Sequence, residues 1–141
     1  VRGMDYTVDL IDDLNQRAAR NGGYTYWAAE RKADGRVIGF CGLDRGHEGS
    51  IVGKLEIGWR LASDCWGHGY ASEGARAALD WASVHCPGEN VFAITAIGNI
   101  RSRAVMERLG MIERPELAFD HPQLAGNDPL RPHVVYEKVM R

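Results

Sequence analysis

The chain has 141 residues, of which 45% are hydrophobic and 26% are charged, and its formal net charge at pH 7 is −2. This length and composition support one hydrophobic core, so we expect a single domain over residues 1–141. The small negative charge gives no general attraction to nucleic acid or to an anionic membrane. No apolar run approaches the roughly 20 residues that cross a bilayer, and no signal-like segment opens the chain, which predicts a cytoplasmic protein.

The cysteines indicate packing residues. Cys41, Cys65 and Cys86 are odd in number and widely spaced, without a C-x-x-C pair. This pattern favours neither a disulfide framework nor a zinc site. We therefore expect reduced thiols and no metal.

The first part of the chain predicts one helix followed by three strands. Apolar residues recur at helical spacing across residues 6–19, and a Gly-Gly pair then ends the helix. The strands are predicted over residues 24–31, 37–43 and 51–61. Asp34-Gly35 indicates a hairpin between the first two strands, and residues 44–50 form a polar loop before the third.

The second part predicts two helices and three more strands. The helices span residues 72–85 and 101–109, and the strands span residues 91–97, 111–117 and 133–139. A proline- and glycine-rich excursion over residues 120–132 separates the last two strands. The strand-helix-strand order of residues 55–97 favours a parallel pair in the centre of the sheet. We therefore predict an α/β fold with one mixed sheet flanked by helices, and with Trp27, Trp59 and Trp81 in its core.

A glycine-containing loop precedes the helix over residues 72–85. It consists of Trp66, Gly67, His68, Gly69, Tyr70 and Ala71. Glycines let the backbone approach a ligand closely, and the start of a helix presents free N–H groups with about half a positive charge. The loop is therefore a candidate anion site that can hold a pyrophosphate, and an ordinary turn is the alternative.

A second motif, N-x-x-S-x-x-V-M-E-R-L-G-M, begins at Asn99. Together with W-G-H-G-Y-A-S-E, F-D-H-P and L-R-P-H-V-V-Y, it resembles the GCN5-related N-acetyltransferases (GNAT), specifically their RimJ/RimL-like branch, over roughly residues 24–140. The resemblance implies the GNAT acyl-CoA N-acyltransferase fold and transfer of the acetyl group of acetyl-CoA, a co-substrate, directly to a primary amine. Family members begin with a strand and a helix before the segment that corresponds to residues 5–20, and these have no counterpart here.

The same resemblance assigns residues to the donor. The diphosphate would bind backbone N–H groups of residues 66–71, where His68 either adds partial charge or has no role. Asn99 would bind the pantetheine side, although a helix N-cap is a sufficient reason for this residue. The pantetheine arm would pair, like an added strand, with the backbone of Trp59, Arg60 and Leu61, whose alternative is an ordinary strand interior.

Acetyl transfer also needs a base and a group that neutralises the departing thiolate. Glu56 is the candidate base, and a cross-strand charge pair is its alternative role. Met106 stands where the family often has a general-acid tyrosine. Ser102 is then the candidate that protonates or stabilises the thiolate. Tyr136 is a further donor candidate, or a packing residue.

The acceptor is left open by the sequence. His121 and His133 either make structural hydrogen bonds or line the acceptor site. The expected partners are acetyl-CoA and an amine, and a homodimer is not excluded. Two other readings remain: a non-catalytic acyl-CoA sensor on the same fold, and an unrelated nucleotide-binding domain that lacks the usual phosphate-loop motifs.

Overall fold

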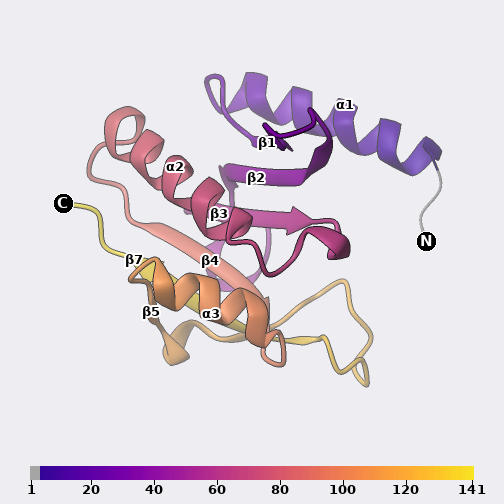
Figure 1. The fold of residues 1–141 in the computed structure, drawn as a ribbon. Coiled ribbons are helices and arrows are strands. Elements are labelled where there is room, and N and C mark those ends of the chain that lie inside the picture. The colour runs from indigo at the N-terminus through magenta and orange to yellow at the C-terminus, as the bar shows by residue number, and fades with distance from the viewer. Residues whose placement is uncertain (1–3) are drawn as a thin grey trace.

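The computed structural model describes residues 4–141, which fold around one β-sheet (Figure 1). Residues 1–3, where the predicted domain begins, lie outside the described residues. The strands are Tyr26–Glu30 (β1), Val37–Arg45 (β2), Leu55–Leu61 (β3), Val91–Ala96 (β4), Ile112–Glu113 (β5), Phe119–Asp120 (β6) and Pro132–Lys138 (β7). The helices are Met4–Arg20 (α1), Tyr70–His85 (α2) and Ile100–Arg108 (α3), with short 3-10 turns at Gly49–Ile51, Ser63–Cys65 and Pro115–Leu117.

Within residues 4–141, the strands follow the order β1-β2-β3-β4-β7-β5, and β6 pairs with β7. The β3–β4 pair is parallel, and the other pairs are antiparallel. Helix α2 connects the parallel strands, as a parallel connection requires. The predicted mixed α/β sheet is confirmed, and so is the parallel pair in its centre.

Helix α1 confirms the helix that the sequence predicts over residues 6–19. Two glycines end it, with φ angles of 79° at Gly22 and 108° at Gly23 that residues with a side chain rarely adopt. The helix buries none of its residues fully and reaches the sheet through Arg17, which pairs with Asp44 on β2. Asp44 points away from the core that α2 covers, because side chains alternate along a strand and its neighbour Leu43 belongs to that core. Helices α1 and α2 therefore lie on opposite faces of the sheet.

The β1–β2 hairpin is confirmed, and Gly35 in its turn has a φ angle of 69°. The two strand boundaries that follow were predicted wrongly. Strand β2 continues through Arg45, so Asp44 lies in a strand and not in the predicted loop, because its backbone pairs with β3 opposite Glu56. Strand β3 begins only at Leu55, since Ile51 sits in a 3-10 turn and is fully buried against Phe92 and Val135.

The main core lies between the sheet and helices α2 and α3. Its buried residues include Leu43, Ile57, Ala75, Val91 and Met106. Small residues on the inner face of α2 let this helix lie close to the strands. Trp59 and Trp81 are partly buried against this core, in agreement with the prediction.

Trp27 was predicted to be a core residue, but its side chain is 37% exposed. It lies on β1, an edge strand of the described sheet, and its ring packs edge-on against Trp81 at 5.4 Å between centroids. One side of the indole is therefore covered and the other faces solvent. Cys41, Cys65 and Cys86 are buried free thiols, as expected.

Two structural features are absent from residues 4–141. None of the described helices combines the length and apolar character that crossing a membrane demands. The described His, Cys, Asp and Glu side chains form no cluster that could hold a metal ion.

Candidate functional site

The two parallel strands separate soon after they meet. Strands β3 and β4 pair at Leu55–Val91 and at Glu56–Phe92, and no further pair joins them in the described chain. Strand β3 stays paired with β2 as far as Leu61. Its other edge therefore has no strand partner beyond Glu56 within residues 4–141. Figure 1 shows that β3 and β4 diverge. An extended ligand fits such an edge because it can hydrogen-bond there as an added strand.

We call the opening between β3 and β4 beyond Glu56 the wedge. The glycine loop, residues 66–71, connects the β3 side of this wedge to α2. Gly67 and Gly69 have φ angles of 82° and 79°, so both need the freedom of glycine, and open space surrounds each α-carbon. Gly69 caps α2 without a side-chain hydrogen bond, and the first helical bond runs from the Glu73 N–H to the Gly69 carbonyl at 3.0 Å. The N–H groups at the start of α2 thus precede the first donor of the helix. Such free N–H groups are what an anion site requires, so the loop stays the candidate anion site that the sequence indicates.

Asn99 forms the opposite side of the wedge. Its side-chain oxygen accepts a hydrogen bond of 3.2 Å from the backbone N–H of Ser102, which confirms its role as the N-cap of α3. The Arg101 guanidinium lies over the Trp66 ring, 5.0 Å from its centroid. The glycine loop and the start of α3, which are far apart in sequence, are therefore in contact.

The backbone residues predicted for the pantetheine arm all lie on β3. On one side Trp59, Arg60 and Leu61 pair with β2, and on the other side no strand of residues 4–141 pairs with them. The Leu61 carbonyl, however, accepts a hydrogen bond of 3.0 Å from the Trp66 indole. This hydrogen bond holds Trp66 at the end of β3. The family resemblance predicts that the backbone of the same residue, Leu61, binds the pantetheine arm.

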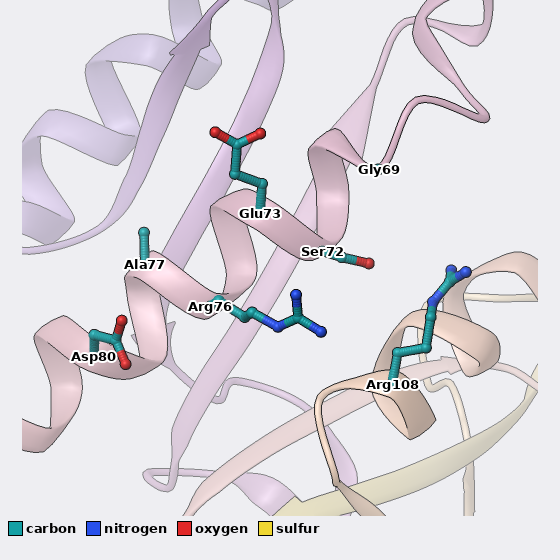
Figure 2. Close-up of a pocket in the computed structure, with 7 residues that line it drawn as sticks. All are labelled: Gly69, Ser72, Glu73, Arg76, Ala77, Asp80 and Arg108. Carbon is teal, nitrogen blue, oxygen red and sulfur yellow. The ribbon is translucent and has the colours of Figure 1, made fainter.

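Two arginines that the sequence reasoning missed stand beside the glycine loop. A cavity of about 500 Å³ runs along α2 from Gly69 and includes Ser72, Arg76 and Arg108. Figure 2 shows Arg76 on α2 and Arg108 on α3 extending into the space between the helices. Ser72 and Arg76 are four residues apart and share one helix face, which the sequence could have shown. Arg108 joins them only through the packing of α3.

Glu56 occupies the last paired position before the strands separate. Its cross-strand neighbours are Asp44 on β2 and Phe92 on β4, so the alternative of a pair with a cation across the strands is wrong. Burial first, and then the charge of Asp44, raise the pKa of Glu56 to about 7, against an opposing effect of Arg17. A carboxylate with this pKa can accept a proton near neutral pH and release it again.

The candidates for an acid differ in their surroundings. Met106 is 1% exposed and belongs to the core, so it takes no part in the site. Tyr136 is 2% exposed, and its hydroxyl contacts the Arg103 guanidinium and the Glu107 carboxylate, each at 3.2 Å. These contacts give Tyr136 a structural role. Ser102, partly exposed in the first turn of α3, is the candidate that keeps an accessible hydroxyl near the wedge.

The three histidines predicted near the ligands have different environments. The His121 and His133 rings lie 5.0 Å apart, each with one local hydrogen bond, to the Gln123 N–H and the Arg131 carbonyl respectively. Burial lowers the pKa of His133, so its neutral form is favoured. His68 is exposed in the glycine loop and packs against the Tyr70 ring at 5.6 Å.

This arrangement, a parallel pair that opens beside a glycine loop at a helix start, is that of the GNAT acyltransferase fold. The sequence model of the Acetyltransferase (GNAT) domain family matches residues 3–112, and the chain belongs to this family. Uncharacterized protein YkkB of Bacillus subtilis (strain 168) is 38% identical over 98 residues, which are 69% of this chain and 56% of that protein. The chain thus spans little more than half the length of this relative.

Solved structures share the fold at low sequence identity. The ribosomal-protein-alanine N-acetyltransferase from Brucella melitensis matches with a TM-score of 0.74 and 16% identity, over 94% of this chain and 78% of that chain. The F149A mutant of spermidine N-acetyltransferase SpeG from Vibrio cholerae matches with a TM-score of 0.68 and 16% identity, over 93% of this chain and 74% of that chain. The names of these two proteins give different acceptors, a ribosomal-protein alanine and spermidine.

Proposed function

We propose that the protein transfers the acetyl group of acetyl-CoA directly to a primary amine, on a small molecule or at a protein N-terminus. The observation that carries the proposal is the wedge between β3 and β4, flanked by the glycine loop and by Asn99, in a chain of the GNAT family. These features lie on elements that only the fold brings together.

The donor is assigned to the wedge by its chemistry. Backbone N–H groups of residues 66–71 suit the diphosphate. The guanidinium groups of Arg76 and Arg108 are proposed as further phosphate contacts, in a cavity that the carboxylates of Glu73 and Asp80 also line. The free edge of β3 at Trp59, Arg60 and Leu61 suits the amide groups of the pantetheine arm. Asn99, the N-cap of α3, is the proposed contact on the pantetheine side.

Glu56 is the base in this proposal. The amine nitrogen attacks the thioester carbonyl and loses its proton to Glu56, directly or through a water molecule, and the carbon–sulfur bond breaks. Deprotonation at pH 7 costs about 4.6 kcal/mol for a lysine-type amine and about 1 kcal/mol for an α-amine. Deprotonation of an α-amine by a carboxylate whose pKa is about 7 is therefore much less unfavourable than deprotonation of a lysine-type amine.

The thiolate that departs needs a proton or a hydrogen bond. Ser102 is the proposed donor, because the other hydroxyl considered, that of Tyr136, is already bound by Arg103 and Glu107. A serine hydroxyl is a weak acid, so much of the rate would come from positioning of the two substrates, which is worth several kcal/mol in well-oriented reactions.

The RimJ/RimL-like branch remains our proposal for the place of this chain in the family, on the strength of its motifs. Two structural neighbours with equal identity to this chain have names that give different acceptors, a ribosomal-protein alanine and spermidine. Fold similarity therefore does not choose the acceptor.

The test is a binding titration followed by a turnover screen. Calorimetry should show acetyl-CoA binding to the wild-type protein, and thiol release should follow when an α-amine peptide or a small amine is added. Stronger binding of ATP or NAD than of acetyl-CoA would favour a nucleotide-binding domain instead.

One observation favours a second candidate, a non-catalytic acyl-CoA sensor. The position of the family tyrosine holds the buried Met106, and Tyr136 has structural partners. A sensor would bind acetyl-CoA with no thiol release from any amine in the screen, so the same two measurements separate the candidates.

A further inference from the structure

Two carboxylates stand directly opposite each other on the sheet face beneath α1. Asp44 on β2 and Glu56 on β3 are register partners, and their side chains point to the same face. Directly opposed residues of antiparallel strands have Cβ atoms about 4.5–5.5 Å apart, and like charges there repel. The two carboxylates are nevertheless held in very different ways.

Asp44 is clamped. It is 1% exposed, and its oxygens accept hydrogen bonds of 2.9 Å from Arg17 and 2.8 Å from Asn21, both at the end of α1. The backbone N–H of Arg45 donates a further bond of 2.8 Å, and the His47 ring nitrogen lies 3.5 Å away. Burial opposes its ionisation, but the hydrogen bonds outweigh burial and hold the pKa of Asp44 below its usual value.

Glu56 has no such clamp. Its carboxylate has no hydrogen-bond or ion-pair partner among residues 4–141. The charged groups that act on it are Asp44, Arg17 and, more weakly, Glu48 in the loop after β2. The Tyr26 hydroxyl on β1 lies near the same face, because it would contact a Cβ at Gly58 at 3.0 Å.

We propose that Asp44 is a positioning residue, fixed in its charged form by the end of α1, whose negative charge adds to the effect of burial and makes the Glu56 carboxylate a stronger base toward the amine. The inference rests on the proposed function, in which Glu56 accepts the proton of the amine. A clamped carboxylate cannot turn away or become neutral easily, so its charge acts on Glu56 permanently. Helix α1 thereby influences the base indirectly, through the ion pair of Arg17 with Asp44.

Two substitutions should shift the pKa of Glu56 in opposite directions. Asp44→Asn removes a negative charge and leaves Arg17 in place, so the pKa of Glu56 should fall. Arg17→Gln leaves Asp44 without its main counter-charge, so the pKa of Glu56 should rise. A purely structural role of the clamp gives no such reversal of sign. We expect shifts of at least about half a pH unit each, given the usual effect of a nearby like charge.

The measurement is a carbon-13 NMR titration of the protein labelled at its glutamate carboxyl carbons, with the Glu56 signal identified by its loss in Glu56→Gln. Asp34→Asn is the matched control, since Asp34 also pairs with an arginine, Arg31, but is exposed in the hairpin turn. This control should leave the Glu56 titration unchanged. Arg17→Lys, which keeps the charge, should restore most of the wild-type value.

A Glu56 titration that stays the same in Asp44→Asn and in Arg17→Gln would overturn the inference. If Asp44→Asn does not fold, the pair Arg17→Gln and Arg17→Lys decides the question in the same way. The titration needs no acceptor, so it stands apart from the proposed function. In a parallel assay of thiol release from acetyl-CoA with an alanine-terminated peptide, a Glu56→Gln variant with the wild-type pH profile would remove Glu56 as the base. The coupling measured by NMR would be unaffected by that result.

Discussion

The two sides of the candidate site are built in different ways. The donor side uses backbone groups: a glycine loop with left-handed φ angles, a helix start without a side-chain cap, and a free strand edge. The acid–base side uses charged side chains from three elements, namely Arg17 on α1, Asp44 on β2 and Glu56 on β3. A site made of backbone groups is formed by residues that are consecutive in the sequence. The protonation state of a buried carboxylate depends instead on residues that are far apart in the sequence. Changes on the two sides should therefore have separable effects, on donor binding and on pH dependence.

The largest expected effect is the loss of the base. Glu56→Gln keeps the size of the side chain and removes its proton affinity, so the rate of acetyl transfer should fall by roughly 10²- to 10⁴-fold. Binding of acetyl-CoA, measured by calorimetry, should change little. Glu30→Gln, an exposed glutamate on β1, is the control and should retain activity. A Glu56→Gln variant that transfers acetyl groups at the wild-type rate would contradict this role.

The same residue should make stability depend on pH. Folding raises the pKa of Glu56 from 4.5 to about 7, so between these values the folded protein holds a proton that the unfolded chain releases. The contribution of Glu56 to the free energy of unfolding should thus fall as pH rises through this window, by on the order of 3 kcal/mol. Denaturant unfolding of wild type and Glu56→Gln at pH 5 and pH 8 measures it. A constant difference between the two proteins would show that Glu56 titrates normally.

On the donor side, the arginines should contribute through charge. Arg76→Leu with Arg108→Leu should weaken acetyl-CoA binding at least about 10-fold, since even one hydrogen bond to a charged group contributes about 1.5–3 kcal/mol. The loss should be smaller in high salt, which screens such contacts. The control is Arg20→Leu, on the exposed end of α1. Equal affinity in the double variant and in this control would place the phosphates elsewhere.

The smallest effect is expected at the contact between the glycine loop and the start of α3. Arg101→Ala removes the cation from the Trp66 ring, an interaction worth about 0.5–1 kcal/mol at exposed sites. Acetyl-CoA affinity should fall about two- to five-fold, as that free energy implies. The tryptophan emission spectrum, to which the exposed Trp66 contributes, should report the loosened loop. An unchanged spectrum would mean that the ring is held by its bond to Leu61 alone.

Local signals in the sequence predicted much of the fold, including the glycine loop before α2. The helices, the hairpin and the glycine loop each depend on residues close together, such as Gly22 and Gly23 or Gly67 and Gly69. The cap at Asn99 is also a local feature. These elements could therefore be located before their neighbours in space were known.

Non-local contacts account for the errors. Asp44 was placed in a polar loop because charged residues usually mark loops, yet it is buried through partners 27 and 23 residues away along the chain. Trp27 was placed in the core by its apolar ring, but an edge strand leaves one side of it exposed. Arg108 carried no signal at all, since its place beside Arg76 depends on how α3 packs.

The central claim, that the wedge and its glycine loop bind acetyl-CoA, is tested most directly by calorimetry on two glycine variants. Gly69→Val and Gly88→Val each force a side chain into a left-handed backbone, at φ angles of 79° and 78°, with open space around both positions. The strain is therefore matched, but only Gly69 belongs to the loop. We predict that wild type and Gly88→Val bind acetyl-CoA and that Gly69→Val loses at least about 10-fold in affinity, because its side chain obstructs the backbone N–H groups that an anion approaches. Absence of binding to the wild-type protein at millimolar acetyl-CoA, or equal affinity in the two variants, would contradict the claim.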